Sequence, residues 1–277
     1  MSIIFASYAN EAMAYSLKRI GRQARRLRIF DEVILYTQAD LSEELRKHPL
    51  MQYSRGGGYW VWKPWLIQKT LNEHPPGDIV VYVDAGSTLR KSPEWNRLFG
   101  LMESYDTLCF QYAETVPQFA RWGNACTQIK YWTKKNALSY LDDYFQDTGY
   151  RENCKIMGGL LFMKNPDNSL LRQWLDISLN HPELIVDPTE EEMKDQEPGF
   201  AYHKHEQSFL TALAYYDKTV CMLPETYESY SPKTFAWASR CRAANFRDYL
   251  PWAIKTHLRC LLGDETFEKG KKLLGIR

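Results

Sequence analysis

Short apolar runs alternate with amphipathic segments along most of this 277-residue chain. Apolar runs at residues 3–8 and 32–36 predict two buried strands, with a helix over 11–27 between them. Residues 79–83 give the strongest strand signal, because a continuous apolar run is typical of a parallel strand covered on both faces. Further strands are expected at 107–112, 155–164 and 219–223, and further helices at 41–47, 64–71, 136–146, 169–179 and 206–216. Strands that alternate with helices predict an α/β sheet that binds ligands at the carboxyl ends of its strands.

The sequence favours a single large domain. A hydrophobic fraction of 44% is enough for a full core, and we find no internal repeat and no low-complexity linker. The segment 187–199 is acidic and contains two prolines, which is typical of a surface loop. The simplest partition is one domain over residues 1–250 followed by a helical tail over 251–277.

Charge balance and aromatic content bear on the kind of ligand that the chain binds. The chain has 35 Lys and Arg against 34 Asp and Glu, so it lacks the basic excess of a general nucleic-acid-binding protein. Aromatic residues make up 14% of the chain. Some must belong to the core, whereas others are expected to line a cleft, because flat rings pack against sugars and nucleobases. The six cysteines are scattered without a CxxC pair, so reduced thiols are expected.

The first ten residues begin directly with a strand-like run and lack the features of a signal peptide. Apolar runs stay far below the roughly 20 residues that a membrane-spanning helix needs. We therefore expect a soluble, cytoplasmic protein, at most peripheral at the inner face of the cell membrane.

The first candidate site is Asp84-Ala85-Gly86, directly after the strongest strand. A carboxylate at the carboxyl end of a central strand faces the ligand crevice, where it can hold a divalent cation or a ribose hydroxyl. Gly86 leaves room for a ligand to approach the backbone. An Asp that only caps a turn after a strand is the equally plausible alternative.

The second candidate site is the glycine triplet at 56–58, which leads into Tyr59, Trp60, Lys63 and Pro64. A glycine-rich loop before a helix exposes backbone amides at a positive helix end, which favours an anion site. Lys63 adds a charge for phosphate, and Tyr59 or Trp60 can face a sugar or base. The alternative is a mobile loop followed by a helix whose aromatic residues belong to the core.

The third candidate site begins at His203 and continues through His205, Glu206 and Gln207. These residue types supply metal ligands, a general base or an acceptor-binding pair. Histidines two residues apart do not share a helix face, so a two-histidine zinc site is not expected. Glu206 at a helix start is also explained by the helix dipole alone.

A fourth candidate is Gly158-Gly159. This pair lets a sugar approach the backbone, or marks a bulge.

These segments, in this order, carry a resemblance over about residues 3–225. The chain resembles bacterial GT-A-type glycosyltransferases of polysaccharide and lipopolysaccharide assembly. The matching segments are Arg55 to Pro64, Tyr82 to Gly86, Gly158 to Phe162 and His205 to Ser208. The resemblance implies a GT-A-like, Rossmann-related α/β fold with a mixed, mostly parallel sheet flanked by helices.

The resemblance also implies site residues. Asp84 stands where the family has the first Asp of its Asp-x-Asp motif, and Glu206-Gln207 stands where many members have an acidic pair beside the acceptor. The expected donor-binding residues are Phe5, Ala6, Ser7, Tyr8, Tyr59, Trp60, Lys63, Asp84, Ala85 and Gly86. The expected acceptor-binding residues are Gly158, Gly159, His205, Glu206 and Gln207. Asp84 and Glu206 are the expected catalytic residues.

This chain departs from the Asp-x-Asp motif at its second Asp, where it has Gly86. A Mn²⁺ or Mg²⁺ ion would then be held by Asp84 alone or with a distant histidine, of which His203, His205 and His257 are the candidates. We expect Asp84 and His203 to be the metal ligands.

Two basic surfaces suggest a further partner. Arg19, Arg22 and Arg26 share one face of the first helix, and basic residues are interspersed with apolar ones in the tail from 251. Both are explained by solvated faces, or by contact with an anionic membrane or a lipid-linked acceptor.

We expect transfer of a sugar from a nucleoside diphosphate sugar, with UDP as the carrier, to a hydroxyl of a saccharide or lipid-linked saccharide in cell-surface glycan synthesis. The alternatives are a sugar nucleotidyltransferase and a non-catalytic carbohydrate-binding protein. The first normally has a glycine-rich basic loop after its first strand, where this chain has Ala6 to Asn10.

Overall fold

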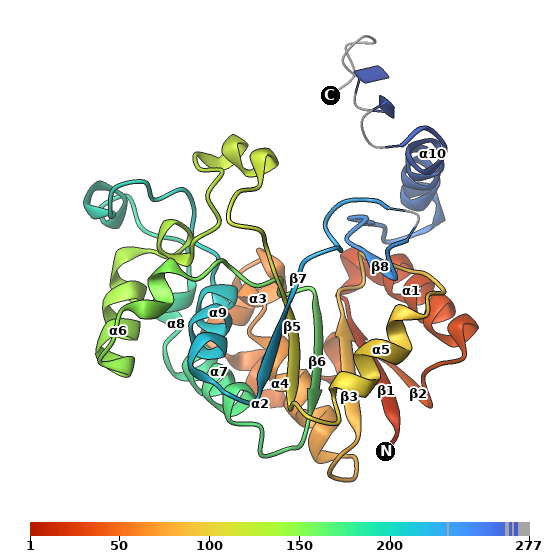
Figure 1. Cartoon of the computed structure of the whole chain (residues 1–277), viewed down its shortest axis with the longest axis horizontal. Coiled ribbons are helices and arrows are strands. Elements are labelled where there is room, and N and C mark those ends of the chain that lie inside the picture. The colour runs from red at the N-terminus through yellow and green to blue at the C-terminus, as the bar shows by residue number, and fades with distance from the viewer. Residues whose placement is uncertain (232, 264–265, 268, 271–277) are drawn as a thin grey trace.

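The computed structural model describes residues 1–231, 233–263, 266–267 and 269–270. Its main sheet has six strands in the order β2-β1-β3-β6-β5-β7 (Figure 1). The strands are β1 Ile3–Tyr8, β2 Glu32–Tyr36, β3 Ile79–Val83, β5 Thr107–Gln111, β6 Leu160–Lys164 and β7 Val220–Pro224. Only β6 runs antiparallel to its neighbours within this sheet. The prediction of a mixed, mostly parallel sheet flanked by helices is confirmed.

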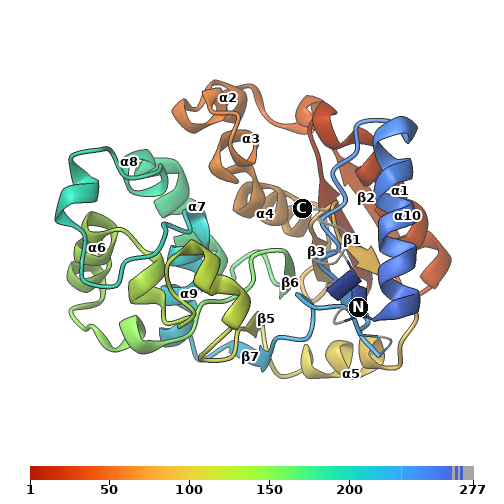
Figure 2. The ribbon, with the colours of Figure 1, turned by 90° about the horizontal axis from the view of Figure 1, so that it is seen from above.

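Helices cover both faces of the sheet (Figure 2). One face carries α4, α7 and α9, which pack on one another, and the other carries α1 and α5. The longer helices are α1 Ala14–Leu27, α4 Trp62–Asn72, α5 Glu94–Leu101, α6 Lys135–Phe145, α7 Ser169–Asn180, α9 Glu206–Tyr216 and α10 Phe246–Leu262. The short helices are α2 Glu43–Lys47, α3 Gly56–Tyr59 and α8 Pro182–Ile185.

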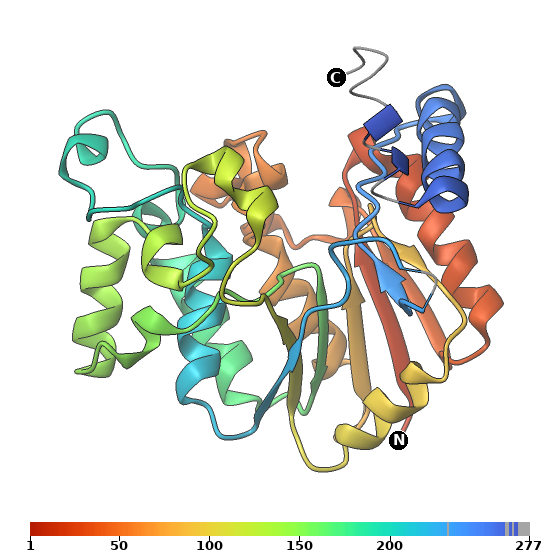
Figure 3. The same cartoon turned by 45° about the horizontal axis from the view of Figure 1, so that its top comes forward.

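The order of the strands brings the candidate segments to one edge of the sheet. β1 and β3 are adjacent and parallel, with Ala6 opposite Tyr82, so both chains leave the sheet at the same edge. After β7, the chain crosses above this edge toward α10 (Figure 3). On the way it forms β8 Ala236–Trp237, which pairs with β4 Thr88–Leu89 just after the Asp84 turn.

Some boundaries differ from the prediction. Gly158 and Gly159 form a turn before β6 rather than part of the strand. α10 begins at Phe246, where Asn245 caps it, so the expected tail boundary at 250/251 falls inside this helix. Residues 264–265, 268 and 271–277 of the expected tail lie outside the described residues.

Arg19 departs from the expected basic face. Arg22 and Arg26 are exposed, but Arg19 is buried, so the expectation of a solvated arginine is wrong at this position. Its guanidinium donates hydrogen bonds to the carbonyl oxygens of Ala85 (3.2 Å) and Ser87. Arg19 therefore fixes the turn that follows Asp84.

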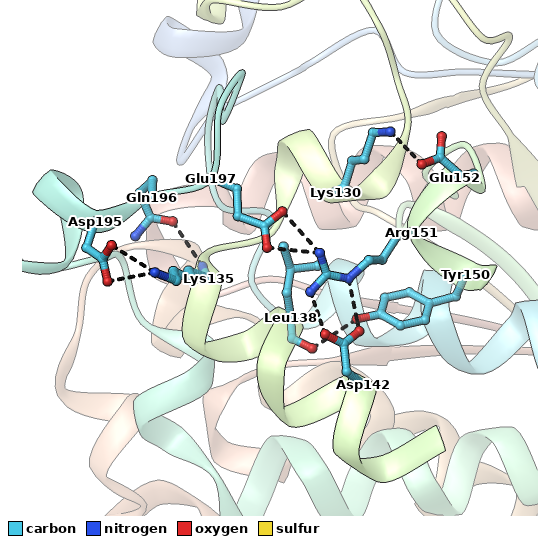
Figure 4. A network of polar contacts seen from close by, with 10 residues as sticks. All are labelled: Lys130, Lys135, Leu138, Asp142, Tyr150, Arg151, Glu152, Asp195, Gln196 and Glu197. Carbon is cyan, nitrogen blue, oxygen red and sulfur yellow. Dashed lines mark hydrogen bonds and ion pairs between the residues drawn. The ribbon is translucent and has the colours of Figure 1, made fainter. Parts of the chain in front are cut away.

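The acidic segment 187–199 is tied to its surroundings by ion pairs (Figure 4). Arg151 binds Asp142 on α6 and also Glu197, and Lys135 binds Asp195. These contacts hold the chain that leads from Asp187 to α9.

Candidate functional site

Two adjoining cavities lie at the carboxyl edge of the sheet. One, of 410 Å³, is lined by residues of the Gly158 turn, the start of α9 and the loop after β5; we call it the inner lobe. The other, of 590 Å³, is lined by the end of β1 and the glycine triplet; we call it the outer lobe. Both lobes are lined by Arg55, Trp60, Asp84, Tyr227, Arg240 and Arg242. They therefore form one continuous site that has Asp84 at its junction.

Asp84 follows β3 and is held by two hydrogen bonds. The Tyr82 hydroxyl donates to Asp84 Oδ1 at 2.7 Å, and the Asp84 amide donates to the Gly159 carbonyl at 2.9 Å. A side chain at position 159 would place its Cβ 2.8 Å from Asp84 Oδ2, so only glycine fits against this carboxylate. With its side chain 38% exposed, Asp84 is fixed in orientation and still open to a ligand.

Lys63 joins two carboxylates beneath the site. Its Nζ lies 3.3 Å from Glu206 Oε1 and 3.7 Å from Asp84 Oδ1, and it donates to the Gly158 carbonyl at 2.9 Å. Both Lys63 and Glu206 are buried. Burial raises the pKa of Glu206, although the Lys63 charge opposes this shift. Glu206 is thus a carboxylate of increased basicity at the wall of the inner lobe.

The two histidines have separate roles. His205 lines the inner lobe and stacks on Trp60, with ring centroids 5.7 Å apart. Burial lowers the pKa of His205 to about 4, so the ring is neutral at pH 7. His203 lines neither lobe, and its two ring nitrogens contact the Lys134 amide and the Leu184 carbonyl. The structure does not bring His203 to Asp84.

The glycine triplet shapes the site through its backbone conformation. Residues 56–60 all have positive φ angles, which glycine adopts without strain. The amides of Gly57, Gly58, Tyr59 and Lys63 all donate to nearby carbonyl oxygens of the same segment. The segment therefore provides a wall with Trp60, rather than the row of free amides expected from the sequence. Tyr59 lines neither lobe and donates from its hydroxyl to Asp187 at 2.8 Å.

The remaining expected residues divide between cavity and core. From β1, only Tyr8 lines the outer lobe, whereas the side chains of Phe5, Ala6 and Ser7 are buried in the core. Ala85 and Gly86 also line the outer lobe. Gly158, Gly159, His205, Glu206 and Gln207 all line the inner lobe.

The part of the site that follows β7 was not expected from the sequence. Tyr227 is buried, and its hydroxyl contacts the Gly159 carbonyl (3.1 Å) and the Ser87 hydroxyl. Arg240 is bound by Glu228 through two contacts of 2.6 and 2.7 Å, while Arg242 is exposed. This segment lacks a hydrophobic period, so only its basic residues could have indicated a role.

The side chains around Asp84 offer a divalent cation one carboxylate. Gly86 stands where a second carboxylate was expected, and the Lys63 ammonium lies 3.7 Å from Asp84, so an ion here would take its other oxygen ligands from water and substrate phosphates. In the part of the chain that the structure describes, three or more acidic, histidine or cysteine side chains nowhere gather to hold a metal. His257, on α10, is exposed.

No protein-family model matches the sequence, and no curated protein matches it either. Among solved structures, the chain is similar to a glycosyltransferase involved in glycosylation of the major capsid of PBCV-1, with 10% identity, a TM-score of 0.45, and coverage of 81% of this chain and 82% of that one. It is also similar to the galactosyltransferase LgtC, crystallised with donor and acceptor sugar analogs. The identity is 16%, the TM-score is 0.38, and the match covers 80% of this chain and 73% of that one. A third match is mouse xyloside xylosyltransferase 1, with 11% identity, a TM-score of 0.41, and coverage of 82% of this chain and 87% of that one. At these scores, function must be argued from the site itself.

Proposed function

We propose that this chain is a glycosyltransferase that moves a sugar from a nucleoside diphosphate sugar to a hydroxyl of a saccharide or lipid-linked saccharide in cell-surface glycan synthesis. UDP is the proposed carrier, from the resemblance described above. The observation that carries the proposal is the two-lobed site, in which one carboxylate, Asp84, lies between two cavities large enough for a nucleotide and a sugar.

In this proposal the outer lobe holds the nucleoside. Tyr8 and Trp62 line it with aromatic rings, and Asn10 supplies amide groups for hydrogen bonds to a base or ribose. Asp84 accepts hydrogen bonds from ribose hydroxyls. The diphosphate lies at the junction of the lobes, where Arg240 and Arg242 can bind its oxygens.

The reaction takes place where the inner lobe begins. The acceptor hydroxyl attacks the anomeric carbon, the bond from that carbon to the diphosphate oxygen breaks, and Glu206 takes up the hydroxyl proton. A raised pKa makes Glu206 a stronger base than an exposed carboxylate. Arginines at the junction stabilise the charge that develops on the departing diphosphate.

The test measures release of UDP from a panel of UDP-sugars by the purified full chain. We expect slow hydrolysis of at least one donor, and a loss of at least about tenfold in Asp84→Ala, the scale of one hydrogen bond to a charged group. Asp167→Ala is the control, because Asp167 is exposed on the surface and lies outside both lobes. Equal rates in Asp84→Ala and the native chain would reject the site.

A carbohydrate-binding protein would bind the same donors without releasing UDP, and a nucleotidyltransferase would form UDP-sugars from UTP and sugar phosphates. Both activities can be measured on the same preparation. Neither alternative explains why a buried carboxylate of raised pKa lines the lobe that receives the sugar.

We also propose that α10 lies on an anionic membrane surface. Within the described residues, none of the helices has the length and apolar character to cross a membrane. α10 instead presents one exposed apolar stripe, made of Phe246, Leu250, Ile254, Leu258, Leu261 and Leu262. Exposed cations, Arg247 and Lys255, accompany it and complement anionic lipid headgroups.

A further inference from the structure

The inner lobe contains two lysines enclosed by aromatic rings. Lys155 is buried, and its Nζ lies 3.2 Å from the ring centroid of Trp132 and 3.9 Å from that of Phe119. Lys204 Nζ lies 4.8 Å from the centroid of Trp122 and is also within cation–π distance of Trp132. Both lysines line the inner lobe and neither lines the outer one.

The carboxylates of the inner lobe are already bound to other cations. Three carboxylates line it: Asp84 and Glu206 are paired with Lys63, and Glu228 is paired with Arg240. Among the described residues, neither Lys155 nor Lys204 has a carboxylate within ion-pair distance. Arg121, which lies 4.0 Å over the ring of Trp122, adds a third such cation. The cationic end of the lobe is thus left without a counter-charge of its own.

Burial and repulsion between cations lower the pKa of both lysines. Burial, followed by repulsion from Lys204, lowers the pKa of Lys155 to about 6. Burial, followed by repulsion from arginines, lowers the pKa of Lys204 to about 8. The charged groups that act on the pair are Arg55, Arg121, Glu228 and Arg240. An anion bound between the lysines would favour their charged forms and relieve this repulsion.

We propose that the inner lobe binds an acceptor sugar that carries a carboxylate or phosphate group, with the anion at Lys155 and Lys204 and a sugar face against Trp122. This inference rests on the proposed glycosyltransferase function. The anion is assigned to the acceptor rather than the donor because both lysines line the inner lobe and neither lines the outer lobe, where the nucleoside is placed. Trp122 is 36% exposed, so the part of its ring that Arg121 and Lys204 leave uncovered can contact a sugar.

The test compares matched acceptors that differ only at C6: methyl glucoside, galactoside and mannoside against their uronates, with the sugar 6-phosphates as a further anionic series. Acceptor-stimulated UDP release is measured with the donor that the native chain hydrolyses. We expect KM to be about tenfold lower for at least one anionic acceptor than for its neutral partner, the scale of one charge-assisted contact.

Lys204→Met keeps most of the side-chain length and removes the charge. We expect it to raise KM for the anionic acceptor about tenfold relative to KM for the neutral partner, while Lys204→Arg retains the preference. Lys135→Met, at an exposed lysine paired with Asp195 outside the lobe, is the control and should retain it as well. Equal KM values for anionic and neutral acceptors in the native chain would overturn the proposal.

The pH dependence gives an independent readout. The charged lysines are lost as pH rises through about 6 for Lys155 and about 8 for Lys204, so KM for the anionic acceptor should increase between pH 6 and 9. KM for the neutral acceptor should stay level across this range. A preference that appears with UDP-glucuronate over UDP-glucose as donor, and not with acceptors, would overturn the assignment to the acceptor.

If no donor is hydrolysed, the proposed function fails, and calorimetric titration of the methyl glycosides and their uronates decides the lysine site separately. Tighter binding of a uronate that Lys204→Met abolishes would support the anion site. Equal binding of each uronate and its neutral partner would reject it.

Discussion

At the scale of single residues, the site depends on a buried cation between two carboxylates. The Lys63 ammonium lies between the carboxylates of Glu206 and Asp84, and it also donates a hydrogen bond to the Gly158 carbonyl. From its place beside the glycine triplet, Lys63 was expected to bind a donor phosphate. The structure instead places its ammonium where it neutralises the site's own carboxylates, so its main effect is on their position and charge.

Replacing this cation should be costly. We expect Lys63→Met to lower the free energy of unfolding by about 3 kcal/mol, because a buried carboxylate loses its partner. Urea unfolding measures the change. Lys69→Met on the same helix is a matched control: Lys69 and Glu73 form an exposed i,i+4 pair, which contributes only about 0.5 kcal/mol. Similar losses in the two variants would contradict a stabilising role for the buried Lys63–Glu206 pair.

At the scale of elements, the apolar pattern was sufficient for the sheet and its main helices. β2, β3 and α9 have the boundaries that the sequence predicted, because each is a continuous apolar run or a clear helical period between polar residues. The pattern could not show that β6 runs antiparallel, because strand direction depends on how connections cross the sheet. α5 and β8 were missed: β8 is only two residues long and needs β4 as a partner.

The backbone conformation of the triplet at 56–58 requires glycine. Gly58 has φ +102°, and a Cβ there would lie 2.5 Å from Met51 Sδ and 3.0 Å from its Cα. We expect Gly58→Ala to lower the free energy of unfolding by about 2–4 kcal/mol through backbone strain and overpacking. Calorimetry and urea unfolding measure it.

Gly100→Ala is the control for this substitution. Gly100 lies in α5 with nothing within 4 Å of a Cβ, so alanine there should be neutral or stabilise the protein by up to about 1 kcal/mol. If both variants lost the same stability, the positive φ angles of the triplet would not be a requirement of the fold.

At the scale of the whole molecule, the site is assembled from segments far apart in the chain. The sequence pointed to Asp84, Glu206 and the Gly158 turn, and the structure brings all three to one cavity. It could not point to Tyr227 or Arg240, because their segment is irregular and reaches the site only by crossing the sheet edge after β7. Arg19 was missed for a related reason, since its partners lie about 66 residues later in the chain.

The position of α10 gives a prediction for the molecule as a whole. This helix lies at one end of the fold (Figure 1), against α1 through the contact of Arg19 with Trp252, and the residues of its apolar stripe are exposed. We expect the full chain to bind vesicles that contain phosphatidylserine, and to bind less as salt increases, because Arg247 and Lys255 lie close to the headgroups. Neutral vesicles should bind less.

The apolar part of this binding can be tested with a matched pair of substitutions. Ile254 and Met193 are 55% and 51% exposed, but only Ile254 lies on the α10 stripe. Ile254→Gln should weaken vesicle binding about tenfold, the effect of removing roughly 1.5 kcal/mol of apolar burial, whereas Met193→Gln should leave it unchanged. Cosedimentation with vesicles measures both. Equal binding by the two variants would mean that the stripe does not meet the bilayer, and α10 would then need a protein partner to cover it.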